Sequence, residues 1–145
     1  MATQYSHILL ASDLLDDNAV VMDRAAELAE HYGSQLSVIH VVERVPIYFG
    51  SELVMPEMQT IETQLVVAAR EKMTAVAQQL GIALERCHVE VGVTKLEILA
   101  FAEQHHVELI VIGSHSRHGL ERLLGATAKT VLNSAPCDVL AVKIK

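Results

Sequence analysis

The segment from Gly113 to Thr127 carries the residue types that can hold a phosphate group. It contains three glycines, small hydroxyl residues and the start of a predicted helix, directly after an apolar run. Glycine lets the backbone approach an anion closely, and the first turn of a helix presents unpaired amides at the positive end of its dipole. Nearby side chains add positive charge to an acidic chain, namely Arg117, His118, Arg122 and Lys129.

The spacing of these glycines matches neither of the common phosphate-binding loops. No Gly-Lys-Ser/Thr ending marks a P-loop, and the tight Gly-x-Gly-x-x-Gly turn of dinucleotide enzymes is missing. Spacing alone therefore leaves two interpretations open. One is a loop that wraps a phosphate, and the other is a loop whose glycines only permit turns.

Other kinds of chemistry have less support in the sequence. The pair His115 and His118 lacks a third ligand at a defined spacing, so we expect no structural metal. No nucleophile elbow, catalytic cysteine motif or pair of carboxylates indicates a hydrolase. His40 lies within an apolar run, where a hydrogen-bonded core histidine is a simpler interpretation than a general base.

Short apolar runs alternate with segments of helical periodicity along the whole chain. Buried parallel strands are short and apolar, whereas amphipathic helices repeat their apolar residues every three or four positions. These patterns predict strands at 7–12, 35–42, 88–91, 107–112 and 138–144, and helices at 21–32, 61–80, 94–106 and 127–132.

Local motifs mark the ends of several of these elements. Gly33 and Gly81 offer C-terminal stops, and the second of them ends a helix of roughly six turns. Thr94–Glu97 fits a capping box, in which the Thr and Glu side chains satisfy free amides at a helix start. Two prolines and a glycine interrupt any regular pattern between Glu43 and Pro56, which predicts a loop.

This alternation predicts one domain, residues 1–145, with an α/β fold. The crossovers are long enough for right-handed parallel connections, which gives a doubly wound, Rossmann-like, five-stranded parallel sheet with helices on both faces. Ligands bind such sheets beyond the carboxyl ends of the strands, where the strand order reverses. That edge would bring together Ser12 and Asp13, Val41 and Val42, Gly92, and the run from Gly113 to His115.

The composition disfavours several classes of protein. A net charge of −7 argues against nucleic acid or an anionic membrane as a partner, because both are held by positive surfaces. Aromatic residues make up only 3%, so the core must consist mainly of Val, Ile, Leu and Ala. Cys87 and Cys137 lie far apart, and the N-terminus shows no signal-peptide or anchor pattern, so we expect free thiols in the cytoplasm.

Several stretches distributed along the chain form a specific combination. They are Ile8–Asp13, His40-Val41, the turn at Gly92, Leu109–His115 with the glycine loop, and Ala135–Val142. In these stretches, and over essentially its whole length, the chain resembles the universal stress protein family. The resemblance implies a cytoplasmic stress-response regulator that forms a homodimer through its final strand, residues 138–144. An open apolar edge at that strand is a pairing hazard unless another chain covers it.

The nucleotide-binding branch of this family has Gly-x-x-Gly, then nine residues, then Gly-Ser/Thr. The resemblance implies a site for ATP, with or without Mg²⁺. By position it consists of Ala11, Asp13, Val41, Ile112, Gly113, Ser116, Gly125, Ala126 and Thr127. The strand edge and the glycine loop add Ser12, His115, Arg117 and Gly119 to the expected site.

Three departures from that pattern leave more than one function open. Ser116 replaces the second glycine, only eight residues separate it from Gly125, and Ala126 replaces the hydroxyl residue, although Thr127 follows. A side chain at Ser116 hinders close backbone approach, and the missing hydroxyl removes a contact, so ATP binding would be weakened or lost.

Three hypotheses follow from this degenerate site. The first is a regulatory homodimer that binds ATP, in which Asp13 holds the ribose or a phosphate-bound metal instead of only capping the next turn. The second is a dimeric interaction or chaperone-like protein that binds no nucleotide. The third, a slow ATP hydrolase or an autophosphorylating protein acting near His115, Ser116 and Thr127, lacks a convincing general base.

Overall fold

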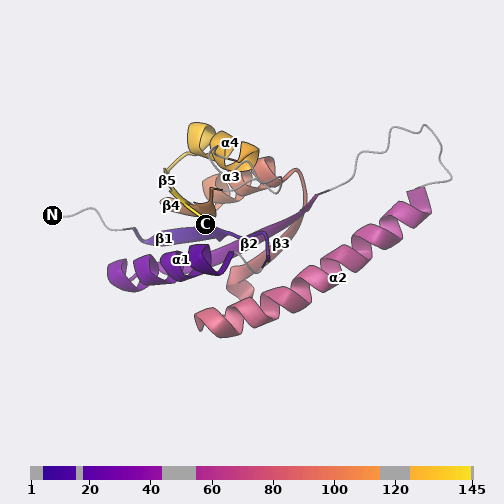
Figure 1. The fold of residues 1–145 in the computed structure, drawn as a ribbon, viewed down its shortest axis with the longest axis horizontal. Helices are drawn as coiled ribbons and strands as arrows, with labels where there is room; N and C mark the ends of the chain where they lie inside the picture. The colour runs from indigo at the N-terminus through magenta and orange to yellow at the C-terminus, as the bar shows by residue number, and fades with distance from the viewer. Residues whose placement is uncertain (1–4, 16–17, 44–54, 115–124, 145) are drawn as a thin grey trace.

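Five parallel strands form one sheet in the order β3-β2-β1-β4-β5 (Figure 1). The computed structural model describes residues 5–15, 18–43, 55–114 and 125–144. The strands are β1 (His7–Ala11), β2 (Gln35–Glu43), β3 (Cys87–Gly92), β4 (Leu109–Gly113) and β5 (Asp138–Val142). Between them lie α1 (Ala19–Tyr32), α2 (Met55–Leu80), the short 3₁₀ helix η3 (Leu84–Arg86), α3 (Thr94–Gln104) and α4 (Ala126–Ser134). The predicted doubly wound α/β fold is confirmed.

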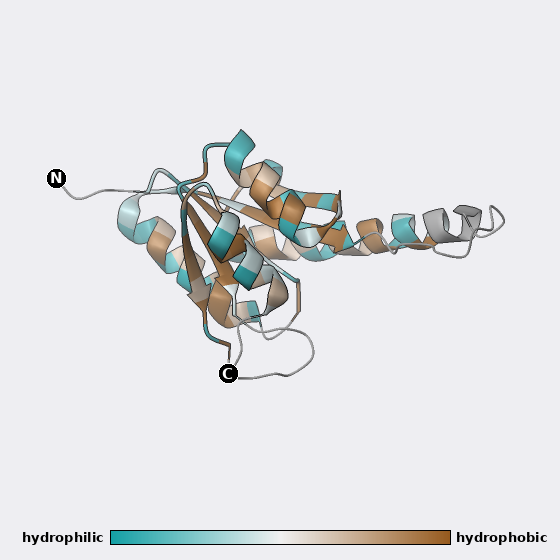
Figure 2. Cartoon of the chain, turned by 90° about the horizontal axis from the view of Figure 1, so that it is seen from above, coloured by the Kyte–Doolittle hydropathy of each residue, from teal (hydrophilic) through white to brown (hydrophobic). Residues whose placement is uncertain are grey.

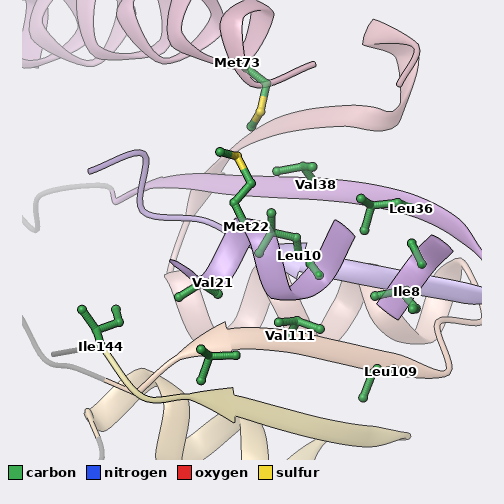
Figure 3. Packing of buried hydrophobic residues seen from close by; sticks show 13 residues of the cluster. Ile8, Leu10, Val21, Met22, Leu36, Val38, Met73, Leu109, Val111 and Ile144 are labelled. Atoms are coloured by element: carbon green, nitrogen blue, oxygen red, sulfur yellow. The ribbon is translucent and has the colours of Figure 1, made fainter. Parts of the chain in front are cut away.

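The sheet separates two hydrophobic cores, because its strands are apolar on both faces (Figure 2). Each fully buried Leu or Ile contributes about 1.5–3 kcal/mol relative to an exposed one. The α1/α2 core contains Ile8, Leu10, Val21, Met22, Leu36, Val38, Met73, Leu109, Val111 and Ile144 (Figure 3). The α3/α4 core contains Leu9, Ala11, Ile39, Val41, Ile98, Phe101, Ala102, Val107, Ile110, Ile112, Ala128 and Val131. Aliphatic residues dominate both cores, as the composition predicts.

Both helix stops that the sequence predicts are present. Gly33 and Gly81 adopt φ values of 65° and 67°, the left-handed conformation that glycine takes without strain. α2, however, has 26 residues and begins at Met55, so it is longer than the six turns expected. Pro56 therefore lies in the first turn of a helix, where proline is tolerated, and not in a loop. Residues 44–54 of the predicted loop lie outside the described residues.

The predicted capping box at the start of α3 is wrong. The N-cap is Val93, and no side chain caps the helix. Because Thr94 is already helical, its hydroxyl is directed elsewhere and donates a 2.7 Å hydrogen bond to Oε1 of Glu43, at the end of β2. The side chain of Glu97 packs over Gly92 instead, where an added Cβ would lie 3.0 Å from Glu97 Cγ.

The final strand is shorter than predicted, because β5 ends at Val142 and not at 144. Ile144 is buried in the α1/α2 core, so the segment after the strand serves packing. Cys87 and Cys137 are both free and half-buried, and burial raises the pKa of both thiols. None of the helices in the described ranges has the length and apolar character that crossing a membrane requires.

Tyr5 connects the chain before β1 to the edge strand β5. Its hydroxyl donates a 2.7 Å hydrogen bond to Oδ2 of Asp138, and its ring meets that of Tyr32 edge-on at a centroid distance of 5.2 Å. The bond to this carboxylate is the main reason that the pKa of Tyr5 is raised to about 12, because it favours the protonated phenol.

We expect Tyr5→Phe to lower the free energy of unfolding by about 1 kcal/mol, because it removes one hydrogen bond and keeps the ring. Urea denaturation measures this change. Tyr32→Phe is the matched control, since its hydroxyl makes no hydrogen bond within the described part of the chain. Equal losses in the two variants would contradict the assignment.

His88 of β3 packs against Phe101 of α3 at a ring-centroid distance of 4.7 Å. Burial, and then the nearby His105, lower the pKa of His88 below its usual 6.5. The folded protein therefore favours the neutral ring. The unfolded chain binds this proton at a higher pH than the folded protein does. The contribution of His88 to the free energy of unfolding is therefore present above pH 6.5 and is lost as the pH falls from there through the folded pKa.

Lowering the pH from about 7.5 to about 5.5 should therefore reduce the free energy of unfolding, and His88→Leu should make this reduction smaller. Urea titrations at both pH values give the comparison. His31→Leu, at an exposed position of α1, should keep the full pH dependence of the parent. An unchanged pH dependence in His88→Leu would show that another group causes it.

Candidate functional site

The carboxyl ends of β1 and β4 lie side by side at the centre of the sheet, where the strand order reverses. Ala11 is in register with Ile112 of β4 on one side and Ile39 of β2 on the other. Ser12 follows directly and donates its backbone amide to the carbonyl of Ile39 at 2.9 Å. Such a switch point is where doubly wound sheets bind their ligands.

Three of the predicted site residues offer a ligand only their backbone. Ala11, Val41 and Ile112 are buried, and their side chains belong to the α3/α4 core. Burial is what makes these strand ends rigid, because the side chains are fixed by packing on both sides. They can form the wall of a site, and specificity must come from the loops that follow.

The turn after β1 is held by its own side chains. Ser12 Oγ accepts hydrogen bonds from the amide of Leu14, at 3.0 Å, and from Nδ2 of Asn18, at 2.8 Å. Asp13 Oδ1 accepts from the amide of Leu15 at 2.9 Å. These bonds stabilise Leu14 at φ 61°, a strained conformation for a residue with a side chain. One oxygen of Asp13 therefore caps the turn, and a ligand role for Asp13 stays a prediction.

Two polar residues support this turn from beneath. Asn18 is only 6% exposed, and its amide reaches Ser12. His40 Nδ1 lies 2.9 Å from the carbonyl oxygen of Ser12, so this nitrogen carries the proton and donates it. His40 is thus a hydrogen-bonded histidine, as expected. The role of Asn18 was not predicted, because a buried amide before a helix looks in sequence like any loop-forming residue.

The predicted phosphate loop is closed at its base by backbone hydrogen bonds. The amide of Ser114 donates to the carbonyl of Val142 at 2.9 Å, and the amide of Gly125 donates to the carbonyl of Ser114 at 2.8 Å. Ser114 and Gly125, which flank residues 115–124, are therefore in direct contact. His115, Ser116, Arg117 and Gly119 belong to this segment and lie outside the described residues.

α4 begins immediately after this closure, at Ala126. Its N-cap is Gly125, and no side chain caps it. The first bond back along the helix runs from the amide of Lys129 to the carbonyl of Gly125 at 2.8 Å. The amides of the first turn, at Ala126, Thr127 and Ala128, precede that bond, and the first amides of a helix have no acceptor within the helix itself. An anion is the ligand that such a helix end favours.

The glycine at 113 has a structural reason that the sequence did not reveal. A Cβ at Gly113 would lie 2.7 Å from Cδ1 of Ile144 and 3.4 Å from Cγ2 of Val21. The glycine therefore makes room for the end of the chain to pack into the α1/α2 core. This packing is a reason for glycine at 113 that does not involve a phosphate, and a ligand role for Gly113 stays a prediction.

Two surface hollows lie away from this edge. One, of about 500 Å³, is lined by residues from the end of α1, the start of β2 and the segment around η3. The other, of about 370 Å³, lies between α2 and β3. Neither is lined by a predicted site residue.

The fold and this edge define a doubly wound α/β domain with a candidate anion site at the β1/β4 switch point. The family profile described as "Universal stress protein family" matches residues 4–143. Universal stress protein A homolog 1 of Coxiella burnetii is 40% identical over 141 residues, covering 97% of this chain and 98% of the relative. The chain belongs to the universal stress protein family.

Solved structures agree with this fold. Universal stress protein UspA from Lactobacillus plantarum superposes with a TM-score of 0.86 at 22% identity, covering 97% of this chain and 99% of that one. A universal stress protein solved in complex with cAMP gives a TM-score of 0.68 at 19% identity, covering 99% of this chain and all of that one, 100%. At these identities the likeness shows the shared fold.

The contact between Gly113 and Ile144 predicts a non-additive pair of variants. Gly113→Ala should lower the free energy of unfolding by about 1–3 kcal/mol through overpacking. Ile144→Val removes the Cδ1 atom and by itself should destabilise by about 0.5–1.5 kcal/mol. In the double variant the added methyl group occupies the vacated space, so the loss should be clearly less than the sum. Additive losses in urea denaturation would contradict this packing.

Proposed function

We propose that this protein is a cytoplasmic stress-response regulator that forms a homodimer and binds ATP, with or without Mg²⁺. The observation that carries the proposal is the uncapped start of α4 at the switch point of the sheet, directly after the Ser114–Gly125 closure. A universal stress protein that holds cAMP supports an adenine nucleotide as the class of ligand.

The phosphates would lie against the first turn of α4. Backbone amides of Ala126 and Thr127, with the hydroxyl of Thr127, supply donors there. The ribose would lie beside Asp13, whose Oδ1 already caps the turn, so its other oxygen would accept from a ribose hydroxyl. The nucleotide bridges the loops after β1 and β4, and in this way its occupancy alters the surface that partners meet.

Equilibrium dialysis with labelled ATP and magnesium should show saturable binding to the parent. Asp13→Asn should weaken it about tenfold, because it removes a charged acceptor while an amide oxygen still caps the turn. Asp23→Asn is the matched control, since it makes the same change at an exposed position of α1. The lack of saturation at millimolar ATP, or equal binding by both variants, would contradict the nucleotide site.

A function without nucleotide is the second candidate, and two observations favour it. Ala126 brings no hydroxyl to the start of α4, and the glycine at 113 is explained by packing. In that case the parent should not bind ATP, and the double variant Ser116→Gly, Ala126→Ser should gain binding. Saturable binding by the parent in the same dialysis would exclude this candidate.

The homodimer would form through the edge of the sheet at β5. β5 pairs with β4 alone among the described strands, and its middle residues Val139, Leu140 and Ala141 are half-buried and uncharged. Antiparallel pairing with the β5 of a second copy would cover this edge across a two-fold axis.

A further inference from the structure

The opposite edge of the sheet, at β3, is also open. Within the described strands, β3 pairs only with β2, so one side of its backbone has no strand to bind. An edge strand presents a row of amides and carbonyls that can pair with another chain. β3 contains no proline that would remove one of these donors.

The side chains of β3 divide into two different rows. Cys87 and Val89 pack against the α1/α2 core, whereas His88 packs against Phe101 on the opposite face. Strand alternation places Glu90 on the same face as His88. The carboxylate of Glu90 raises the pKa of His88 and so opposes the larger effect of burial. One face of this edge therefore carries a basic and an acidic group two residues apart.

This spacing is self-complementary. When two identical strands pair antiparallel around a two-fold axis at Val89, residue 88 of one copy lies opposite residue 90 of the other. His88 then faces Glu90 of the second copy, and the same pair forms again on the other side of the axis. An imidazole N–H that faces a carboxylate directly can donate a hydrogen bond to it, and the ring need not be protonated for this, so the pair stabilises an antiparallel arrangement.

The other face of this edge has apolar surface to cover. The 370 Å³ hollow between α2 and β3 runs along this edge, and its lining consists of Arg70, Met73 and Thr74 of α2, Leu84 of η3 and the β3 residues Cys87, His88, Val89 and Glu90. Leu84 is 51% exposed, and so is Val67, which lies three and seven residues before Arg70 and Thr74 and thus on the same helix face. Figure 1 shows α2 running along this side and extending beyond the sheet.

A two-fold axis perpendicular to the joined sheet keeps each face of the sheet on its own side. It therefore brings the α2 of the second copy to the same face, next to this hollow. In this one arrangement His88 and Glu90 meet their counterparts in the second copy, and the face with Cys87 and Val89 lies next to the second copy's α2. A strand of unrelated sequence would gain the backbone bonds but not the two pairs of His88 with Glu90.

We propose that β3 is a self-association surface, at which two copies of this chain pair their β3 strands antiparallel, with His88 of each copy opposite Glu90 of the other. This surface is distinct from the β5 edge. When both edges are paired, each copy has two neighbours, so the assembly grows beyond a dimer. The proposal does not depend on the nucleotide.

Sedimentation equilibrium of the full chain tests the pairing of His88 with Glu90. Glu90→Lys replaces the acceptor that faces His88 with a cation and should weaken β3 pairing about tenfold or more. The exchange variant His88→Glu, Glu90→His restores the complementarity and should restore the affinity. Glu85→Lys is the matched control, because it makes the same charge change at an exposed position just before β3.

Hydrogen exchange on the same samples separates the two edges. In the parent, amides of 87–92 should exchange more slowly as concentration rises, and Glu90→Lys should abolish this effect while leaving 138–142 unchanged. Protection confined to 138–142, or a loss in Glu85→Lys equal to that in Glu90→Lys, would overturn the proposal and leave the β5 homodimer intact.

A cross-link tests the register independently of charge. Val89 meets itself across the axis, so Val89→Cys in a background with Cys87→Ser and Cys137→Ser should form a covalent dimer under mild oxidation. Ala83→Cys, an exposed position before η3, is the control in the same background. No covalent dimer from a folded Val89→Cys protein, or equal cross-linking at Ala83, would overturn the register.

Discussion

Burial of β1 and β4 on both faces is the constraint on which the rest of this structure depends. These neighbouring strands carry apolar side chains at almost every position, so helices must cover both sides. The chain meets this requirement by winding outward from β1 to β2 and β3, and then returning to begin again at β4. The reversal leaves two strand ends side by side without a crossover above them. A ligand edge is thus a consequence of how the core is covered.

The end of the chain is part of the same construction. Ile144 packs against the space that Gly113 leaves empty, and Val142 accepts a hydrogen bond from Ser114. The start of the predicted phosphate loop is therefore fixed by residues at and after β5, more than twenty positions further along the chain. These contacts also stabilise the last strand. A change in packing at β5 and a change at Gly113 or Ser114 therefore affect the same group of packed residues.

The sequence predicted what depends on local pattern and missed what depends on distant contacts. Apolar runs identified all five strands, and Gly33 and Gly81 marked helix ends, because periodicity and left-handed glycine are properties of the segment itself. The capping box at Thr94 is wrong because the hydroxyl of Thr94 binds Glu43, which lies far away in the sequence at the end of β2. The reason for the glycine at 113 was invisible for the same cause, since Ile144 meets it only in the folded chain.

The two open edges of the sheet differ in chemistry, and this difference bears on how copies recognise one another. β5 presents the uncharged run Val139–Ala141, whereas β3 presents His88 and Glu90 on one face. Pairing β3 with the β5 of another copy would set these two polar groups against apolar side chains and leave them without partners. Burying an unpaired charge is costly, so pairing of β3 with β3 and of β5 with β5 is favoured over pairing of β3 with β5. Head-to-tail growth of the sheet is thereby disfavoured, and symmetric contacts at each edge are what the surface chemistry selects.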